Sequence, residues 1–133
     1  GVDIDENVLS AALKAEYDSR SVKDVPPDYL ERYFNRLGGG MYRLKQEIRD
    51  LVSFEHVNLM DRKALRSERN YDFIFCRNML IYFDDQSRKQ VVERFYTMLN
   101  RGGYIFLGHA ESLSRITTSF KIKRIDGFTV YQA

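Results

Sequence analysis

Residues 71–84 read YDFIFCRNMLIYFD, and the expected fold can be built outward from this stretch. The apolar run 73–76 is rich in aromatic and β-branched residues and too short for a helix, so it predicts a strand. The run does not alternate, which is typical of a strand buried on both faces in a parallel sheet covered by helices. Arg77 and Asn78 follow directly, and Tyr82 follows one turn later. Because ligands bind at the carboxyl ends of strands in open α/β sheets, these three residues are the first candidates for chemistry.

The chain has 133 residues, of which 44% are hydrophobic and 30% charged, with a net charge of +2. This length predicts one domain, and the charge balance indicates neither a nucleic-acid-binding nor a membrane-binding surface. No apolar stretch approaches the length of a membrane span, and no signal peptide is recognisable. The single cysteine, Cys76, rules out an internal disulfide and fits a reducing cytoplasm. Cys76, His56 and His109 are scattered, which argues against a zinc site.

The chain begins with residues that look like the end of a strand, GVDID. Asp5 is a good N-cap, and apolar residues recur after it at helical spacing, so residues 6–17 are expected to form an amphipathic helix. An acidic residue between a strand and a helix is where nucleotide-like ligands bind through their ribose hydroxyls, and Asp3 has that position. A solvated aspartate in a loop explains the same position, and position alone favours that simpler explanation.

A second helix is expected at residues 28–37, started by Pro27 and ended by the glycines 38–40. The three glycines are interpreted as a linker. A phosphate-binding loop would need a strand before them and a helix after them, and neither is expected here.

Residues 41–59 are expected to form two strands, with the turn at 46–47 or at 49–50. Asn58 lies at the end of the second strand. Its amide can both donate and accept a hydrogen bond, so it is a second candidate for ligand binding, although an ordinary turn asparagine explains the position equally well.

The rest of the chain predicts a helix at residues 85–99, a buried strand at 104–108 and a final pair of strands at 120–125 and 128–132. Asp126-Gly127 between the last two strands is a strong hairpin signal. Strands that alternate with helices and close in an antiparallel hairpin predict a doubly wound α/β sheet with a reversed edge.

Residues 73–84 resemble the signature of the chemotaxis receptor glutamate O-methyltransferases, the CheR family. Four further stretches resemble the family in the right order, and the resemblance covers essentially the whole chain. These stretches are residues 3–5, residues 21–27 with 29–30 and 33–34, residues 57–59 and residues 103–109. The resemblance implies a Rossmann-like methyltransferase sheet that depends on S-adenosylmethionine. In the family, a helical domain and a first strand with a glycine-rich turn come before the position where this sequence starts. Residues 1–133 are therefore expected to be a partial methyltransferase domain, truncated at its amino end, with 41–57 as an inserted β-hairpin subdomain.

The resemblance further implies a cytoplasmic enzyme that methylates glutamate side chains on methyl-accepting chemotaxis receptors. The cofactor would be S-adenosylmethionine, and the product S-adenosylhomocysteine. Arg77 and Tyr82 are the expected catalytic residues. The expected cofactor-binding residues, from the same resemblance, are Asp3, Asn58, Leu59, Arg77 and Asn78.

The chemistry of these side chains agrees with that expectation. A glutamate with an ordinary pKa of about 4.3 is ionised at neutral pH, so methyl transfer to it needs orientation and exclusion of water rather than a general base. The planar fork of Arg77 can hold a carboxylate, and the Tyr82 hydroxyl can donate to the same group. The alternatives are a salt bridge at a strand end for Arg77 and a core aromatic for Tyr82. Cys76 is interpreted as a small buried residue and not as a nucleophile.

A second functional class stays open, a catalytically silent module that captures a receptor tail by strand addition at the edge of the β-hairpin subdomain. Arg77 and Tyr82 favour the enzyme, whereas the missing glycine-rich turn favours the module for the chain by itself. The 133-residue chain alone is expected to bind cofactor weakly and to be inactive. Its uncovered sheet edge is expected to produce a dimer or larger homo-oligomer.

Overall fold

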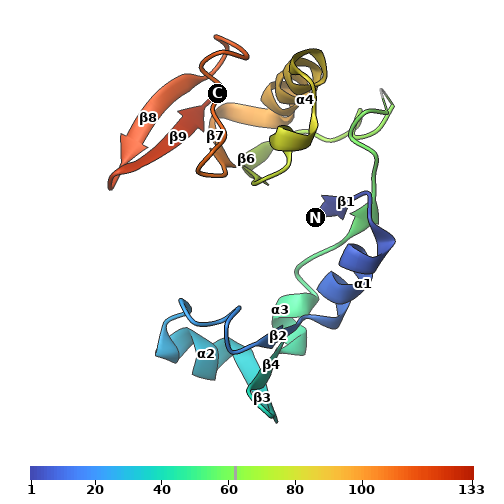
Figure 1. Ribbon diagram of the computed structural model, residues 1–133, viewed down its shortest axis with the longest axis vertical. Coiled ribbons are helices and arrows are strands. Elements are labelled where there is room, and N and C mark those ends of the chain that lie inside the picture. Colours follow the sequence, from blue (N-terminus) through green and yellow to red (C-terminus); the bar gives the residue numbers. More distant parts are fainter. Residues whose placement is uncertain (62) are drawn as a thin grey trace. The chain divides into compact units, whose positions relative to one another are not determined.

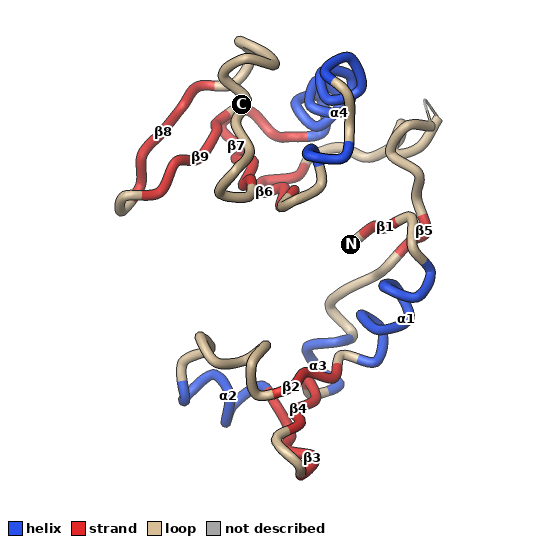
Figure 2. Tube along the Cα trace, in the orientation of Figure 1, coloured by secondary structure: helices blue, strands red, loops and turns tan. Residues whose placement is uncertain are grey.

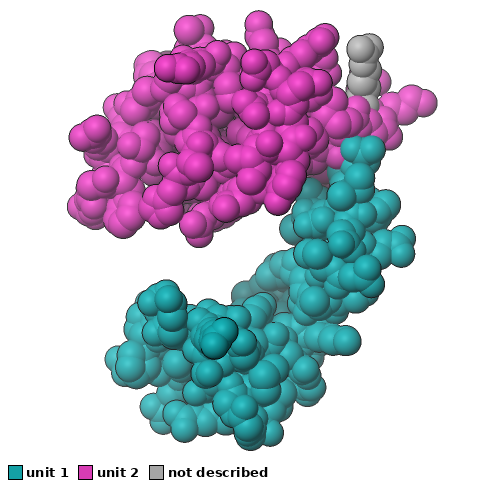
Figure 3. All heavy atoms as spheres, in the orientation of Figure 1, with its two compact units in different colours: residues 1–58 teal, residues 59–133 magenta. Residues whose placement is uncertain are grey.

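The computed structural model describes residues 1–61 and 63–133. The chain divides into two compact units, residues 1–58 and residues 59–133, and each is described by itself (Figures 1 and 3). The assignment of residues 1–133 to a single partial domain stays a prediction. No helix in the described part of the chain is both long enough and apolar enough to cross a membrane.

The first unit contains two small sheets and three helices. Strands β1 (Val2–Asp3) and β5 (Glu55–His56) pair in parallel, while β2 (Glu16–Asp18), β4 (Met41–Leu44) and β3 (Phe34–Gly38) form an antiparallel sheet in that order. The helices are α1 (Glu6–Lys14), α2 (Pro27–Tyr33) and α3 (Gln46–Arg49). As predicted, Asp5 caps α1, where its side chain accepts a hydrogen bond from the Asn7 amide.

Both predicted helices of this unit are shorter than expected. The first was expected to reach residue 17, but it ends at Ala15, which adopts a left-handed conformation with φ of 53°. The second was expected to reach residue 37, but residues 34–38 form β3 instead. In each case the lost helical residues pair with β4, so sheet pairing overrides the helical spacing.

The antiparallel hairpin does not lie at residues 41–57, where the sequence predicted it. It consists of β3 and β4, and the glycines 38–40 form its turn with φ values of 90°, 58° and 77°. Glycine adopts positive φ values more readily than other residues, which explains three glycines in a row. They form a tight turn and not the linker that was expected. Residues 46–49 form α3 instead of a turn, and β5 pairs with β1 rather than with β4.

The second unit is a four-stranded sheet with one long helix. Its strands are β6 (Tyr71–Cys76), β7 (Leu99–Leu107), β8 (Lys121–Ile125) and β9 (Phe128–Gln132), arranged in the order β6-β7-β9-β8 (Figure 2). β6 and β7 are parallel, whereas β9 is antiparallel to both of its neighbours. The mixed sheet and its final hairpin confirm the predicted fold class. Asp126 and Gly127 both have positive φ, as the predicted tight turn requires.

Helix α4 (Asp85–Met98) lies between β6 and β7 in the chain, and its N-cap is Asp84. The hydrogen bond from the Ser87 amide to Asp84 lowers the pKa of that carboxyl. The apolar stripe of α4 packs with the sheet in one core, made of Cys76, Leu80, Val91, Val92, Phe95, Met98, Ile105, Leu113, Phe120 and Tyr131.

Strand β6 is covered on one face only, contrary to the sequence prediction. Ile74 and Cys76 face the core, whereas Phe73 is 57% exposed and Phe75 is 72% exposed. The two exposed rings stack along the neighbouring strand, with Phe75 and Phe106 centroids 4.8 Å apart. Alternation along a strand sends these residues to the face opposite α4, so an apolar run does not guarantee burial on both sides.

Candidate active site

Three of the predicted site residues, Arg77, Asn78 and Tyr82, follow the end of β6. Because β6 and β7 are parallel and Cys76 pairs with Leu107, Arg77 and Gly108 both begin loops at the same edge of the sheet. After β6 the chain runs through Arg77, Asn78 and Met79 into the single 3-10 turn η1 (Leu80–Tyr82), and then into α4. The carboxyl ends of β6 and β7 thus carry two facing loops, 77–83 and 108–112.

A carboxylate joins these two loops. Glu111 Oε2 accepts hydrogen bonds from the amides of Asn78 and Gly108, both at 2.8 Å. Its Oε1 accepts from the amides of Met79, at 3.1 Å, and Leu80, at 2.8 Å. One half-buried side chain therefore satisfies four main-chain donors from two segments.

Gly108 makes this close approach possible. It is buried, and a Cβ added to it would lie 2.6 Å from Asn78 Oδ1 and 2.8 Å from Glu111 Oε2. Such distances are far below van der Waals contact, and the Asn78 amide nitrogen lies 3.1 Å from the same position, so a side chain at position 108 would displace the side chains of Asn78 and Glu111 and press on the main chain of Asn78. The amide of Glu111 donates to the Gly108 carbonyl at 3.0 Å, which closes a tight turn and directs the carboxylate back toward β6.

The three predicted residues of this loop have different environments. Arg77 is exposed, and its guanidinium makes no hydrogen bond or ion pair with any residue of 1–61 or 63–133. Asn78 is also exposed and adopts a left-handed conformation with φ of 56°. Tyr82 is 80% exposed. The structure thus gives no support to a strand-end salt bridge for Arg77 or to a core aromatic for Tyr82.

Cys76 comes immediately before this loop and faces the core, with 5% of its surface exposed. Burial, together with the nearby Glu111 carboxylate, raises the pKa of the Cys76 thiol to about 12. A thiol that stays protonated at neutral pH is a poor nucleophile, which agrees with the structural role predicted for it.

The remaining candidates for ligand binding belong to the first unit and to the start of the second. Asp3 ends β1 and pairs with His56 of the parallel strand β5, so Asn58, two residues beyond His56, lies near the same strand edge. Asp3 Oδ1 accepts a hydrogen bond from the Asp5 amide at 2.9 Å, and the Asp3 carbonyl accepts from Val57 at 2.9 Å. Asp3 is half-buried and Asn58 is exposed.

Leu59 begins the second unit and packs against its core. Its carbonyl accepts a hydrogen bond from Arg94 of α4 at 2.9 Å, and the same nitrogen donates to the carbonyls of Asp61, at 3.0 Å, and Ala64, at 3.4 Å. Arg94 thereby holds the segment that starts at Leu59 against the helix. The structure groups Arg77, Asn78, Tyr82 and Leu59 in one unit and Asp3 with Asn58 in the other.

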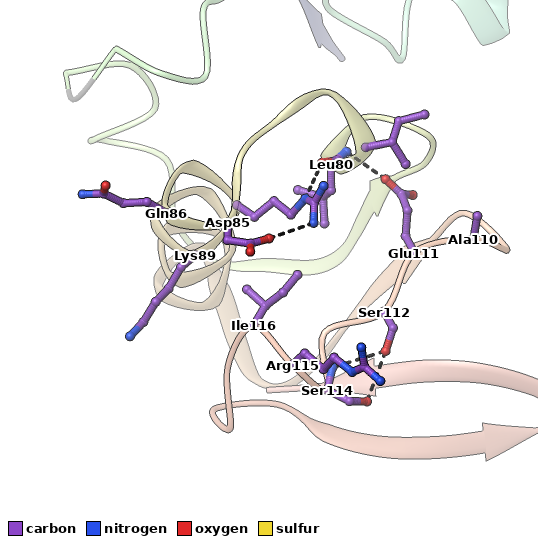
Figure 4. Close-up of a pocket in the computed structure, with 12 residues that line it drawn as sticks. Leu80, Asp85, Gln86, Lys89, Ala110, Glu111, Ser112, Ser114, Arg115 and Ile116 are labelled. Carbon is purple, nitrogen blue, oxygen red and sulfur yellow. Dashed lines mark hydrogen bonds and ion pairs between the residues drawn. The ribbon is translucent and has the colours of Figure 1, made fainter.

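An open groove lies beside the Glu111 contact, between η1, the first turns of α4 and residues 110–116 (Figure 4). Glu111 and Leu80 reach toward each other across one side of it. Arg88 donates from Nε to the Leu80 carbonyl at 2.8 Å and forms an ion pair with Asp85 at 3.1 Å. Arg88 and Glu111 therefore fix the two main-chain polar groups of Leu80, and the buried Leu80 side chain anchors the turn.

Sequence reasoning missed Glu111. The polar stretch 108–112 at the end of a predicted strand was the available signal, because it marks a second loop at the edge that carries Arg77. Nothing in the sequence indicated which side chain of that stretch would turn back onto the main chain of residues 78–80.

Comparison with known proteins identifies the family of the chain. Residues 1–128 match the family described as CheR methyltransferase, SAM binding domain. The chain is 46% identical over 129 residues to chemotaxis protein methyltransferase 2 of Vibrio cholerae, which covers 97% of this chain and 45% of that protein. It is 36% identical over 132 residues to the chemotaxis protein methyltransferase of Escherichia coli, with 97% and 45% covered. It is also 34% identical to chemotaxis protein methyltransferase 1 of Pseudomonas aeruginosa, with 98% and 47% covered.

The fold and the strand-end loops define a domain of the S-adenosylmethionine-binding methyltransferase class. Within that class the chain belongs to the CheR family, as the match over residues 1–128 shows. It spans about half the length of the curated relatives that it matches.

S-adenosylmethionine is the cofactor of this domain, and each unit carries polar groups whose chemistry suits parts of such a ligand. A carboxylate such as Asp3 suits the paired hydroxyls of a ribose, and amides such as Asn58 and Asn78 suit the donors and acceptors of an adenine or of an amino acid. Within the described residues, the second oxygen of Asp3, Oδ2, makes no hydrogen bond.

Proposed function

We propose that this protein methylates glutamate side chains on chemotaxis receptors, and that Arg77 and Tyr82 act on the substrate. When bound, S-adenosylmethionine supplies a methyl group on a sulfonium, which an ionised carboxylate can attack directly. The protein then has to hold the carboxylate in line and keep water away from it.

The observation that carries the proposal is the exposed Arg77 at the carboxyl end of β6. Its guanidinium has no partner in residues 1–61 and 63–133, so it is available to an incoming carboxylate. A guanidinium binds a carboxylate through two parallel hydrogen bonds, which fixes orientation as well as position. The exposed hydroxyl of Tyr82 is the second donor proposed for the same group.

Cofactor binding is proposed for Asp3, Asn58, Leu59, Arg77 and Asn78. Asp3 would hold the ribose hydroxyls, and Asn78 with the main chain of 58–59 would bind the adenosine and methionine parts. Residue types and strand-end positions support these roles.

The test is methyl transfer by the full-length protein to a purified receptor cytoplasmic fragment, with radiolabelled methyl donor. Arg77→Ala is expected to lower kcat about tenfold or more, because a charged hydrogen-bonding group is lost from the substrate, while the Kd for S-adenosylhomocysteine changes far less. Arg124→Ala, in the exposed strand β8, is the matched control and should behave like wild type. An equal loss of cofactor affinity would mean that Arg77 serves the cofactor alone and not the substrate, and an unchanged kcat would remove Arg77 from the reaction.

A second candidate is the silent receptor-tail module. The observation in its favour is that β3 is an edge strand of the sheet β2-β4-β3, where an extended peptide can add. This candidate predicts that the full-length protein binds a receptor-tail peptide but transfers no methyl group. Methyl transfer by the wild-type protein would exclude it.

A further inference from the structure

We propose that Glu111 is a positioning residue for methyl transfer, which holds the loop 77–80 in the conformation that presents Arg77 and Asn78. This inference rests on the proposed function and adds to it a residue that contacts neither substrate nor cofactor. Glu111 acts through the main chain alone.

The carboxylate of Glu111 is fully used by its four amide partners. Each oxygen accepts two hydrogen bonds, Oε2 from Asn78 and Gly108 and Oε1 from Met79 and Leu80. An ionised carboxylate offers about four acceptor positions, so the side chain is matched in number to the donors around it. Such a group is suited to holding main chain in place.

The loop needs this acceptor because its own hydrogen bonds are few. Beyond β6 the amides of residues 78–80 have left the ladder. Among residues 1–61 and 63–133, the main-chain bonds at the η1 turn run from Tyr82 to the Met79 carbonyl and from Phe83 to the Leu80 carbonyl. Asn78 has a left-handed backbone, which asparagine tolerates better than most residues but which still costs more than a right-handed one. An external acceptor therefore offsets both the unpaired amides and the backbone cost.

Position 108 gives an independent sign that the two loops are fitted to each other. A Cβ there would meet both Asn78 Oδ1 and Glu111 Oε2 at less than 3 Å. The glycine permits the contact, and the turn from Gly108 to Glu111 aims the carboxylate at the loop. Movement of residue 108 or 111 would therefore displace Asn78 and its neighbour Arg77.

The first measurement is amide hydrogen exchange in the wild-type protein and in Glu111→Gln. The amide side chain has nearly the same shape, but one acceptor oxygen becomes an NH2 donor that faces other donors. Exchange at Asn78, Met79, Leu80 and Gly108 should accelerate about tenfold or more, while the amide of Val92 in the core of α4 stays protected. Glu93→Gln, which alters an exposed glutamate paired with Lys89 on α4, is the matched control.

The second measurement is methyl transfer at saturating cofactor and receptor, with active sites counted by the stoichiometry of S-adenosylhomocysteine binding. Displaced reacting groups lower the rate within the bound complex, so Glu111→Gln should lower kcat per site about 10-fold to 100-fold. A purely structural glutamate would instead reduce the number of sites and leave kcat per site unchanged.

Gly108→Ala provides a second route that keeps the charge of Glu111. Its added methyl group is expected to displace Asn78, and it should lower kcat per site as Glu111→Gln does. Normal kcat per site in Glu111→Gln or Gly108→Ala, or unchanged exchange at the four amides in Glu111→Gln, would overturn the positioning role. An inactive wild-type protein would overturn the proposed function itself, and this inference with it.

Discussion

Tyr82 illustrates how a single side chain can be misjudged from its neighbours. Its sequence neighbours Leu80, Ile81 and Phe83 are apolar, so a core aromatic was a reasonable alternative to a catalytic role. In the structure Leu80 is 2% exposed whereas Tyr82 is 80% exposed, because one 3-10 turn rotates the two residues to opposite sides. A phenol that is exposed to water favours a binding role over a packing role.

At this scale we predict that Tyr82→Phe lowers methyl transfer without changing stability. The hydroxyl makes no hydrogen bond among the described residues, so the free energy of unfolding measured in urea should match wild type. The activation free energy should rise by about 0.5–1.5 kcal/mol, the net value of one hydrogen bond, since an exposed hydroxyl loses less than a buried one.

The control for this variant is Tyr96→Phe on α4, whose ring packs edge-on against Phe120. It should leave the rate unchanged. A wild-type rate for Tyr82→Phe would remove the hydroxyl from the reaction, and a loss of stability would mean that Tyr82 packs in solution.

At the scale of elements, helix α4 does more than cover the sheet. Its apolar side packs on β6 and β7, while Arg94 extends from it to the carbonyls of Leu59, Asp61 and Ala64. One guanidinium nitrogen therefore ties the start of the second unit to the helix that follows β6. This tie fixes the main chain at Leu59, which is one of the proposed cofactor-binding residues.

We predict that Arg94→Ala lowers the free energy of unfolding by about 1.5–3 kcal/mol. The carbonyls of Leu59 and Ala64 are partly buried, and hydrogen bonds from a charged donor contribute about this much. Urea denaturation followed by circular dichroism is the measurement. Arg101→Ala, an exposed arginine of β7, should change stability by less than about 0.5 kcal/mol. Equal effects of the two substitutions would contradict the anchoring role of Arg94.

At the scale of the whole molecule, β6 is an edge strand of its sheet and carries an aromatic face. Phe73 and Phe75 are exposed on it and stack with rings of β7. Edge strands with exposed apolar side chains pair readily with another chain. The face of β6 is therefore the surface through which we expect a homo-oligomer to form. The homo-oligomer itself stays a prediction.

We predict that the 133-residue polypeptide self-associates through β6. Light scattering over a concentration series should give a mass above the 15.7 kDa of one chain. Phe75→Lys should shift the mass toward the monomer, because a charge on this face would be buried on association. Phe128→Lys, an equally exposed site on the β8–β9 hairpin, should not. A monomer mass at high concentration for wild type would refute the prediction.

Several elements follow from local sequence alone. The strand β6, the helix α4 and the β8–β9 hairpin were predicted because an apolar run, helical spacing and Asp126-Gly127 each act within a short stretch of the chain. The family signature likewise consists of contiguous residues, and the family in turn indicates the cofactor. Arg77, Asn78 and Tyr82 could be chosen because they follow a strand that the sequence itself reveals.

Tertiary structure decided what depends on distant partners. The glycines 38–40 form a hairpin turn because residues 34–38 pair with β4. The exposure of Phe73 and Phe75 depends on which face of the sheet α4 covers. Glu111 gained its role through amides more than 30 residues earlier in the chain. A carboxylate in a polar loop has no local preference for one set of main-chain donors, so only the parallel pairing of β6 with β7 could select them.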